Sequence, residues 1–142
     1  MIQLAIAGAA GRMGQSLISA CEGHESFALA HAFEQSGHES VGQSAGSGQS
    51  AVILSDGIDG PSFDVLIDVT SPVASLANLA FCAEHGRKAV IGTTGLSDSD
   101  RERMAELAKK TAVVWAPNMS VGVNVTLRLL ELAARAFGDE VD

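Results

Sequence analysis

The sequence predicts an α/β fold with a doubly wound parallel sheet, that is, a sheet covered by helices on both faces. Short apolar runs alternate along the chain with segments of helical periodicity. The connections between them are short, as is usual where helices cross between parallel strands. A glycine-rich turn also stands between the first apolar run and the first helical segment. These observations predict one such domain over residues 1–142.

The first half of the chain contains the glycine turn and a polar loop. Residues 2–7 (IQLAIA) predict a buried strand, residues 8–14 the turn, residues 12–22 a helix, and residues 27–33 (FALAHAF) a second strand. Residues 35–50 are rich in Gly and Ser. We expect a flexible surface loop there rather than a linker between domains, because strand patterns resume after it.

The second half repeats the alternation of strand and helix. Residues 52–54, 63–69, 88–91 and 112–116 predict strands. Ser71 as N-cap and Pro72 predict a helix to about residue 84, and Ser97 with Asp100 forms the capping-box pattern of a helix to about residue 110. A last helix is predicted at 121–137, because apolar residues recur on one face at Val123, Leu127, Leu130, Ala134 and Phe137.

Composition limits the class of protein. Hydrophobic residues make up 46% and charged residues 18% of the chain, which excludes an acidic disordered tail and a coiled coil. No apolar run has the roughly 18 residues of a membrane helix, and no basic region of a signal peptide opens the chain. Cys21 and Cys82 form no metal or disulfide pattern. We therefore expect a cytoplasmic, reduced protein without a metal site.

The charge balance argues against nucleic acid or an anionic membrane as a partner, because both require a basic patch. Nine basic and seventeen acidic residues give a net charge of −8. The basic residues are also unevenly distributed, since no Lys or Arg lies between Arg12 and Arg87.

The glycine turn is a variant of the dinucleotide-binding motif of Rossmann-like folds. Gly8 permits a tight turn, Gly11 lets the backbone approach a pyrophosphate, and Gly14 allows the helix to pack closely on the strand. The helix N-terminus then offers free N–H groups to phosphates, and Arg12 could add a charged contact. The alternative is that the glycines only serve the tight connection between strand and helix.

Glu34 follows the second predicted strand, 20 residues after Gly14. An acidic side chain at this place binds the adenosine ribose hydroxyls. The alternative is a solvated carboxylate at a strand end. A carboxylate repels a 2′-phosphate, and the next residue, Gln35, is neutral; Arg12, and more weakly His38, are the candidates for a nearby cation. We therefore predict that NADH binds at least as well as NADPH.

Three later motifs follow predicted strands, where open α/β sheets bind ligands. They are D-V-T-S-P at 68–72, G-T-T-G at 92–95 and A-P-N-M-S-V-G-V-N at 116–124. Their hydroxyl and backbone groups suit a nicotinamide ribose or a small polar substrate. The alternative is that Ser and Thr cap helices and that Asn118 ends a strand.

In this order and spacing, the motifs resemble the dihydrodipicolinate reductases (4-hydroxy-tetrahydrodipicolinate reductases) of bacterial lysine and diaminopimelate synthesis, over the whole chain. The resemblance implies an N-terminal Rossmann-like domain that binds NADH or NADPH. It also implies a C-terminal α+β domain for the substrate and for a homotetramer, absent from this chain, with helix 121–137 leading towards it.

The resemblance carries the family's cofactor-binding residues onto this sequence. The pyrophosphate loop corresponds to Gly8, Ala9, Ala10, Gly11, Arg12 and Met13. Glu34 corresponds to the ribose ligand, and Thr70 is also expected to bind the cofactor. The nicotinamide end corresponds to Gly92, Thr93, Thr94, Ala116, Pro117, Asn118 and Met119, and Thr94 is also expected near a substrate carboxylate.

The sequence departs from the family's pattern at two positions. Gln35 stands where many NADPH-competent members have Arg, and Val69 replaces the usual Phe. The family's catalytic His-His pair and Lys are expected beyond Asp142, so no catalytic residue is predicted within this chain. The four histidines match none of that motif: His24, His31, His38 and His85.

The resemblance implies reduction of 4-hydroxy-tetrahydrodipicolinate, a small cyclic dicarboxylate, to tetrahydrodipicolinate. We expect the 142-residue chain to bind the dinucleotide without turnover and to be a monomer or weak dimer. Two alternatives remain. One is the N-terminal domain of another nicotinamide dehydrogenase, such as a homoserine or aspartate dehydrogenase. The other is a stand-alone NAD(H)-binding sensor.

Overall fold

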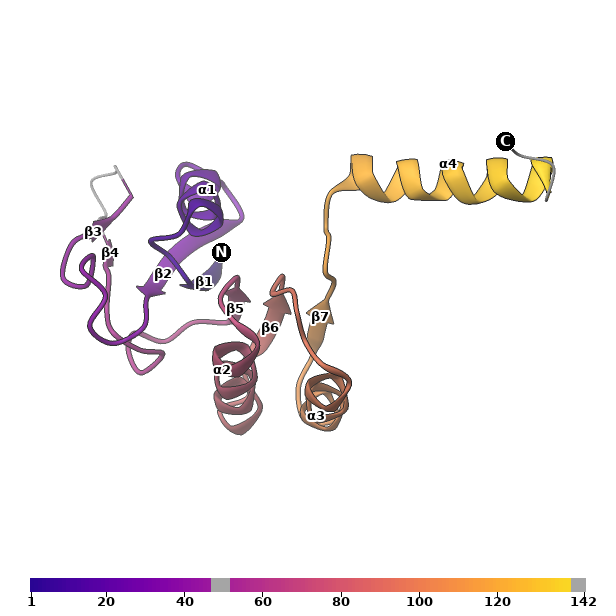
Figure 1. Cartoon of the computed structure of the whole chain (residues 1–142). Helices are drawn as coiled ribbons and strands as arrows, with labels where there is room; N and C mark the ends of the chain where they lie inside the picture. The colour runs from indigo at the N-terminus through magenta and orange to yellow at the C-terminus, as the bar shows by residue number, and fades with distance from the viewer. Residues whose placement is uncertain (47–51, 139–142) are drawn as a thin grey trace.

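A computed structural model describes residues 1–46 and 52–138. Its main sheet has five parallel strands in the order β2-β1-β5-β6-β7 (Figure 1). The strands are β1 (Ile2–Ala7), β2 (Phe27–Phe33), β5 (Val65–Asp68), β6 (Lys88–Ile91) and β7 (Val113–Trp115). From β1 the chain adds β2 on one side and β5 on the other, so the strand order reverses between β1 and β5. Ligands of open parallel sheets bind at such a reversal.

The helices confirm the predicted Rossmann-like α/β architecture. They are α1 (Arg12–Cys21), α2 (Pro72–Glu84), α3 (Asp98–Ala108) and α4 (Val121–Phe137). Helix α1 lies on one face of the sheet, and α2 and α3 lie on the other (Figure 1). Predicted and observed ends of these elements differ by at most two residues.

Strand β1 is buried on both of its faces. Leu4 and Ile6 pack with Ile18 of α1, whereas Ala5 and Ala7 pack on the opposite face with residues such as Leu66. A near-continuous apolar run is the usual sequence of a parallel strand covered on both sides. This packing fixes the carboxyl end of β1, where the glycine turn begins.

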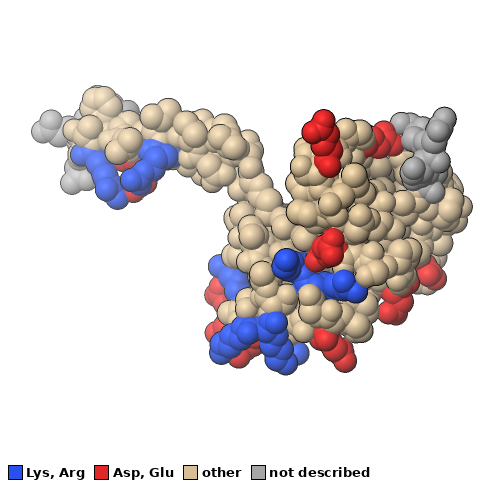
Figure 2. Space-filling view, turned by 180° about the vertical axis from the view of Figure 1, so that it is seen from behind, with Lys and Arg blue, Asp and Glu red and all other residues tan. Residues whose placement is uncertain are grey.

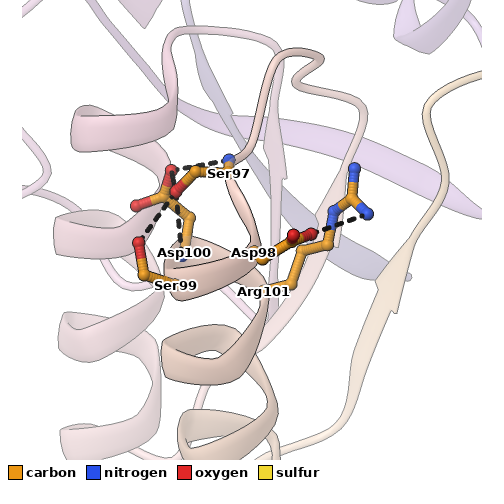
Figure 3. Close-up of polar contacts among 5 residues, drawn as sticks. All are labelled: Ser97, Asp98, Ser99, Asp100 and Arg101. Carbon is orange, nitrogen blue, oxygen red and sulfur yellow. Dashed lines mark hydrogen bonds and ion pairs between the residues drawn. The ribbon is translucent and has the colours of Figure 1, made fainter.

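Serine side chains begin α2, α3 and α4, as the sequence predicted for the first two. In the capping box of α3, the Ser97 hydroxyl accepts the N–H of Asp100 at 3.2 Å, and the Asp100 carboxylate accepts the N–H of Ser97 at 2.9 Å (Figure 3). The hydrogen bonds from Ser97 lower the pKa of the Asp100 carboxyl below its usual value. Helix α1 differs, because Gly11 occupies its N-cap position and no side chain caps it.

The expectation of a flexible loop over residues 35–50 is wrong at residues 44–45. There β3 (Ser44–Ala45) pairs antiparallel with β4 (Val52–Ile53). The physical reason is burial: Ala45 is 3% exposed and packs in the cluster that contains Ile18 and Leu54. Residues 47–50 of the predicted loop lie outside the described residues.

Helix α4 projects from the rest of the molecule (Figure 1), and none of its described residues is buried. On the predicted apolar face, Val123, Leu127, Leu130 and Phe137 are 42–67% exposed. Figure 2 shows the projecting helix as a largely uncharged surface with charged side chains near its far end. Within residues 1–46 and 52–138, no helix has the length and apolar character needed to cross a membrane.

Gly14 provides the sharpest test of the packing between α1 and β1. A Cβ at this position would lie 2.2 Å from the carbonyl oxygen of Gly8 and 2.7 Å from the Cα of Ala9. Both atoms belong to the backbone and cannot rotate away. We therefore expect Gly14→Ala to lower the free energy of unfolding by roughly 3 kcal/mol, as measured by urea denaturation.

Gly57→Ala is the matched control, because a Cβ there meets no atom within 4 Å and the residue does not have a positive φ. The control should unfold at nearly the wild-type urea concentration. Equal midpoints for Gly14→Ala and Gly57→Ala would contradict the close packing.

Candidate functional site

Three adjoining clefts lie at the reversal of strand order, and Val69, just after β5, lines all of them. The largest, of about 690 Å³, is named the threonine cleft and is lined by Met13, Leu17, Ile67, Val69, Thr70, Val90, Gly92, Thr93, Thr94, Ala116, Pro117, Asn118, Met119 and Ser120. The glutamate cleft is lined by Gly8, Gly11, Phe33, Glu34, Gln35, His38, Asp56, Gly57, Ile58, Val69, Thr70, Ser71, Ala74, Ala77 and Asn78. The turn cleft is lined by Gly8, Gly11, Arg12, Met13, Gly14, Ser16 and Val69.

The glycine turn joins the ends of three strands. The N–H groups of Gly8 and Ala9 donate to the carbonyl of Phe33, at 3.1 and 3.3 Å, which ties the turn to β2. Gly8 has a φ of +75°, and a Cβ there would lie 3.0 Å from the carbonyl oxygen of Val69. Only glycine combines this conformation with so close an approach to the backbone that follows β5.

The start of α1 is suited to an anion. Its N-cap, Gly11, has no side chain to accept the first N–H groups, and its first turn contains no acidic residue. Arg12 and Met13, the first two helical residues, both line the turn cleft. Unpaired N–H groups and the positive end of a helix dipole bind phosphates well, so the turn cleft fits the pyrophosphate of a dinucleotide.

Glu34 lies directly against the glycine turn. Its Oε1 accepts the N–H of Ala10 at 2.9 Å, and its Oε2 accepts the N–H of Gln35 at 3.3 Å. The side chain is half-buried and lines the glutamate cleft beside His38. Each carboxylate oxygen has two lone pairs, so Glu34 can accept further hydrogen bonds from a ligand in that cleft.

A buried polar network lies beneath the junction of the threonine and glutamate clefts. Its centre is Asp68, which has no exposed surface. Oδ1 of Asp68 is 2.6 Å from the Thr70 hydroxyl, 3.1 Å from the Thr70 nitrogen, 2.7 Å from the Ser75 hydroxyl and 3.3 Å from the Thr93 hydroxyl. Oδ2 accepts from the Asn78 amide at 2.8 Å. The network thus links β5, α2 and the segment after β6.

Thr93 is held on two sides and is 3% exposed. Its hydroxyl is 2.7 Å from that of Ser75 and accepts the N–H of Thr70 at 3.1 Å. Its carbonyl accepts the indole N–H of Trp115 at 3.2 Å. Thr94, by contrast, is exposed at the threonine cleft, so its side chain is the better placed of the two to contact a ligand.

Residues 116–119 form the wall of the threonine cleft between β7 and α4. Oδ1 of Asn118 accepts the N–H of Ser120 at 2.8 Å, and its carbonyl accepts from the Asn124 side chain at 3.1 Å. Asn118 therefore also shapes the turn into α4, whereas the alternative interpretation had it end a strand; β7 ends earlier, at Trp115. Met119 remains 48% exposed.

The structure brings most of the predicted cofactor-binding residues to these clefts. Ala9 and Ala10 do not line them: Ala9 is fully buried, and the N–H of Ala10 is donated to Glu34. Of the histidines, only His38 lines a cleft; His31 is buried with its Nε2 3.0 Å from the carbonyl oxygen of Gly57. That these residues bind a cofactor stays a prediction. The part of the chain that the structure describes contains no group of three or more potential metal ligands.

The structural roles of Asp68, Ser75 and Asn78 were not predicted, although Asp68 stood in a quoted motif. A signal was present in the sequence: Ser71, Ser75 and Asn78 recur at intervals of four and three residues, which puts polar groups on one face of α2. Ser75 and Asn78 on that face form hydrogen bonds to Asp68, whereas Ser71 caps the helix.

The parallel sheet, its glycine turn and the adjoining clefts define an α/β domain of the Rossmann type. Residues 2–119 match the family described as dihydrodipicolinate reductase, N-terminus. The chain belongs to this family and corresponds to its N-terminal part. The predicted resemblance is thereby confirmed.

A curated relative is the 4-hydroxy-tetrahydrodipicolinate reductase of Chromohalobacter salexigens, which is 48% identical over 146 aligned positions. The alignment covers 99% of this chain and 54% of the relative, so the chain spans about half the relative's length.

Solved structures show the same fold. Dipicolinate-bound dihydrodipicolinate reductase from Paenisporosarcina sp. TG-14 matches with a TM-score of 0.76 at 24% identity, over 94% of this chain and 54% of that one. Aspartate dehydrogenase from Thermotoga maritima matches with a TM-score of 0.59 at 16% identity, over 88% of this chain and 49% of that one.

The polar network also affects Cys82 of α2, which is fully buried. Burial, and secondarily the negative charge of Asp68, raises the pKa of the Cys82 thiol from 9.0 to about 12, while Arg87 lowers it slightly. Because the folded-state pKa exceeds the unfolded one, the protonated thiol contributes stability below pH 9. This contribution is lost as the pH rises towards 12.

We therefore expect wild type to lose more stability than Cys82→Ala between pH 8 and pH 10.5. The difference in free energy of unfolding between the two proteins should change by about 2 kcal/mol, as measured by urea denaturation at both pH values. A difference that stays constant across this range would show that Cys82 titrates normally in the folded protein.

Proposed function

We propose that this chain is the dinucleotide-binding half of an NAD(P)H-dependent 4-hydroxy-tetrahydrodipicolinate reductase. The observation that carries the proposal is the meeting of three clefts at Val69, beside a helix start that no side chain caps. A dinucleotide has two nucleoside ends joined by a pyrophosphate, and the three clefts offer one place for each part.

The residues would hold the cofactor in an extended arrangement. Gly11, Arg12 and Met13 would bind the pyrophosphate in the turn cleft, and Glu34 would accept hydrogen bonds from the adenosine ribose. Thr94 and Asn118 would contact the nicotinamide end in the threonine cleft. The bound cofactor would supply the hydride, and the protein would supply position and electrostatics.

The proposed substrate is a small cyclic dicarboxylate. The solved relative from Paenisporosarcina sp. TG-14 is described as dipicolinate-bound, which supports this class of substrate. Thr94, exposed at the edge of the threonine cleft, is proposed to lie near a substrate carboxylate. The likeness to aspartate dehydrogenase concerns the fold, whereas the family match favours the reductase.

The rest of the reaction machinery is proposed to lie in a substrate domain to which α4 leads. The exposed apolar residues of α4 support this, because such surfaces usually mark an interface. We propose a cytoplasmic homotetramer for the complete enzyme, and a monomer or weak dimer for the 142-residue chain.

The cofactor preference follows from the charges around Glu34. Gln35 is neutral, and no Lys or Arg lines the glutamate cleft. A 2′-phosphate there would meet the carboxylate of Glu34 without a compensating cation. We expect NADH to bind at least as tightly as NADPH in titrations at moderate salt, and Gln35→Arg to shift the ratio of dissociation constants towards NADPH by about tenfold.

Gln35→Met is the matched control, since it keeps the side-chain length without adding charge and should leave the ratio unchanged. Binding of NADPH by wild type more than tenfold tighter than that of NADH would overturn the proposed preference.

If this chain binds the cofactor and the proposed substrate domain supplies the proton donors, the chain alone should bind the cofactor without turnover. The 142-residue chain should bind NADH, as measured by calorimetry, yet show no reduction of 4-hydroxy-tetrahydrodipicolinate above the uncatalysed rate. The physical reason is that the proposed proton donors belong to the substrate domain. Measurable turnover by the isolated chain would show that this domain is dispensable.

A further inference from the structure

Asp68 is a buried acidic residue without an ionic partner among the residues that the structure describes. It has no exposed surface, and none of the ion pairs in residues 1–46 and 52–138 includes it. All of its hydrogen-bond partners are neutral amides or hydroxyls. A buried carboxylate is costly unless it is well hydrogen-bonded, so its presence calls for a physical explanation.

Asp68 accepts hydrogen bonds from two N–H donors, the backbone of Thr70 at 3.1 Å and the side-chain amide of Asn78 at 2.8 Å. Thr70 and Ser75 each have one hydroxyl proton, and both hydroxyls lie closest to Oδ1 of Asp68, at 2.6 and 2.7 Å. When Ser75 donates to Asp68, its free lone pair can accept the proton of Thr93 at 2.7 Å. In this arrangement the hydroxyl protons of the network point towards Asp68. This arrangement fits an ionised carboxylate, which only accepts.

The carboxylate of Asp68 lies one hydrogen bond away from residues that line the ligand clefts. Thr70 and Thr93, both in contact with Asp68, line the threonine cleft, and Asn78 lines the glutamate cleft. The carboxylate of Asp68 itself has no exposed surface, so solvent does not contact it. A charge in such surroundings acts over longer distances than a solvated one, because little screens it.

We propose that Asp68 is an electrostatic positioning residue whose charge makes the threonine cleft prefer a cationic ring over a neutral one. The inference rests on the proposed function, in which the nicotinamide lies in this cleft. The oxidised nicotinamide ring carries one positive charge, whereas the reduced ring is neutral. The charge of Asp68 therefore favours the form of the ring that results from reduction of the substrate, and it favours that form before any substrate binds. Preorganised charge of this kind lowers the barrier to the reaction.

Asp68→Asn separates the charge from the hydrogen bonds. The Asn oxygen can still accept from Thr70 and Ser75. The amide of Asn78 can turn, so that its oxygen accepts from the new NH₂ group. The substitution thus removes one charge and preserves the shape of the network.

The test compares the dissociation constants of NAD⁺, NADH and ADP-ribose by calorimetry on the full 142-residue chain. ADP-ribose lacks the nicotinamide ring and reports binding by the other two clefts. For Asp68→Asn we expect NAD⁺ to bind about fivefold more weakly relative to NADH, while the affinity for ADP-ribose changes less than about twofold.

Two further variants separate charge from structure. Ser75→Ala loosens the network but keeps the charge, so the ratio of NAD⁺ to NADH affinity should stay at the wild-type value. The double variant Asp68→Asn with Asn78→Asp moves the charge across one hydrogen bond of 2.8 Å and should also keep a ratio near that of wild type. This double variant tests the charge even if Asp68→Asn alone fails to fold, which circular dichroism would reveal.

The outcomes distinguish the two proposals. If wild type binds none of the three ligands, the proposed function fails and this inference fails with it. If wild type binds them but Asp68→Asn weakens NAD⁺ and NADH equally, the inference alone is overturned. A ratio that changes in Ser75→Ala as much as in Asp68→Asn, or that is lost in the double variant, would overturn it as well.

Discussion

The close contact of α1 with the end of β1 is the constraint on which the rest of the site depends. At Gly14 the helix backbone comes so near to Gly8 and Ala9 that no Cβ fits between them. The helix therefore begins after only four intervening residues, and its first residues, Arg12 and Met13, line the turn cleft. In the same turn, the N–H of Ala10 donates to the carboxylate of Glu34, and Gly8 lies against the backbone of Val69. One steric condition thus brings together the ends of β1, β2 and β5.

The local parts of this arrangement could be predicted because neighbours in the sequence determine them. The apolar runs predict the strands, Ser97 and Asp100 predict the start of α3, and the spacing from Gly14 to Glu34 places a carboxylate beside the turn. In the loop after β2 the prediction was wrong, because the burial of Ala45 depends on α1 and on a strand further along the chain. The composition of the loop does not show that Ala45 packs against α1 or that its segment pairs with β4.

The network around Asp68 could not be predicted for the same reason. Its members come from β5, from α2 and from the segment after β6, and they meet only once the sheet has formed. A motif containing Asp68 and Thr70 suggested that these residues matter, but not that Thr93 would be buried and Thr94 exposed. Both threonines line the cleft, but Thr93 is held by Asp68, Ser75 and the indole of Trp115, contacts that form only in the folded sheet.

Helix α4 gives the cleft a mechanical property. The segment 116–120 is both the wall of the threonine cleft and the stem of the helix, and Asn118 is hydrogen-bonded to Ser120 and Asn124. No described side chain of α4 is buried. A partner bound to its apolar side would therefore be joined to the wall of the cleft through the short segment 116–120 and the hydrogen bonds of Asn118.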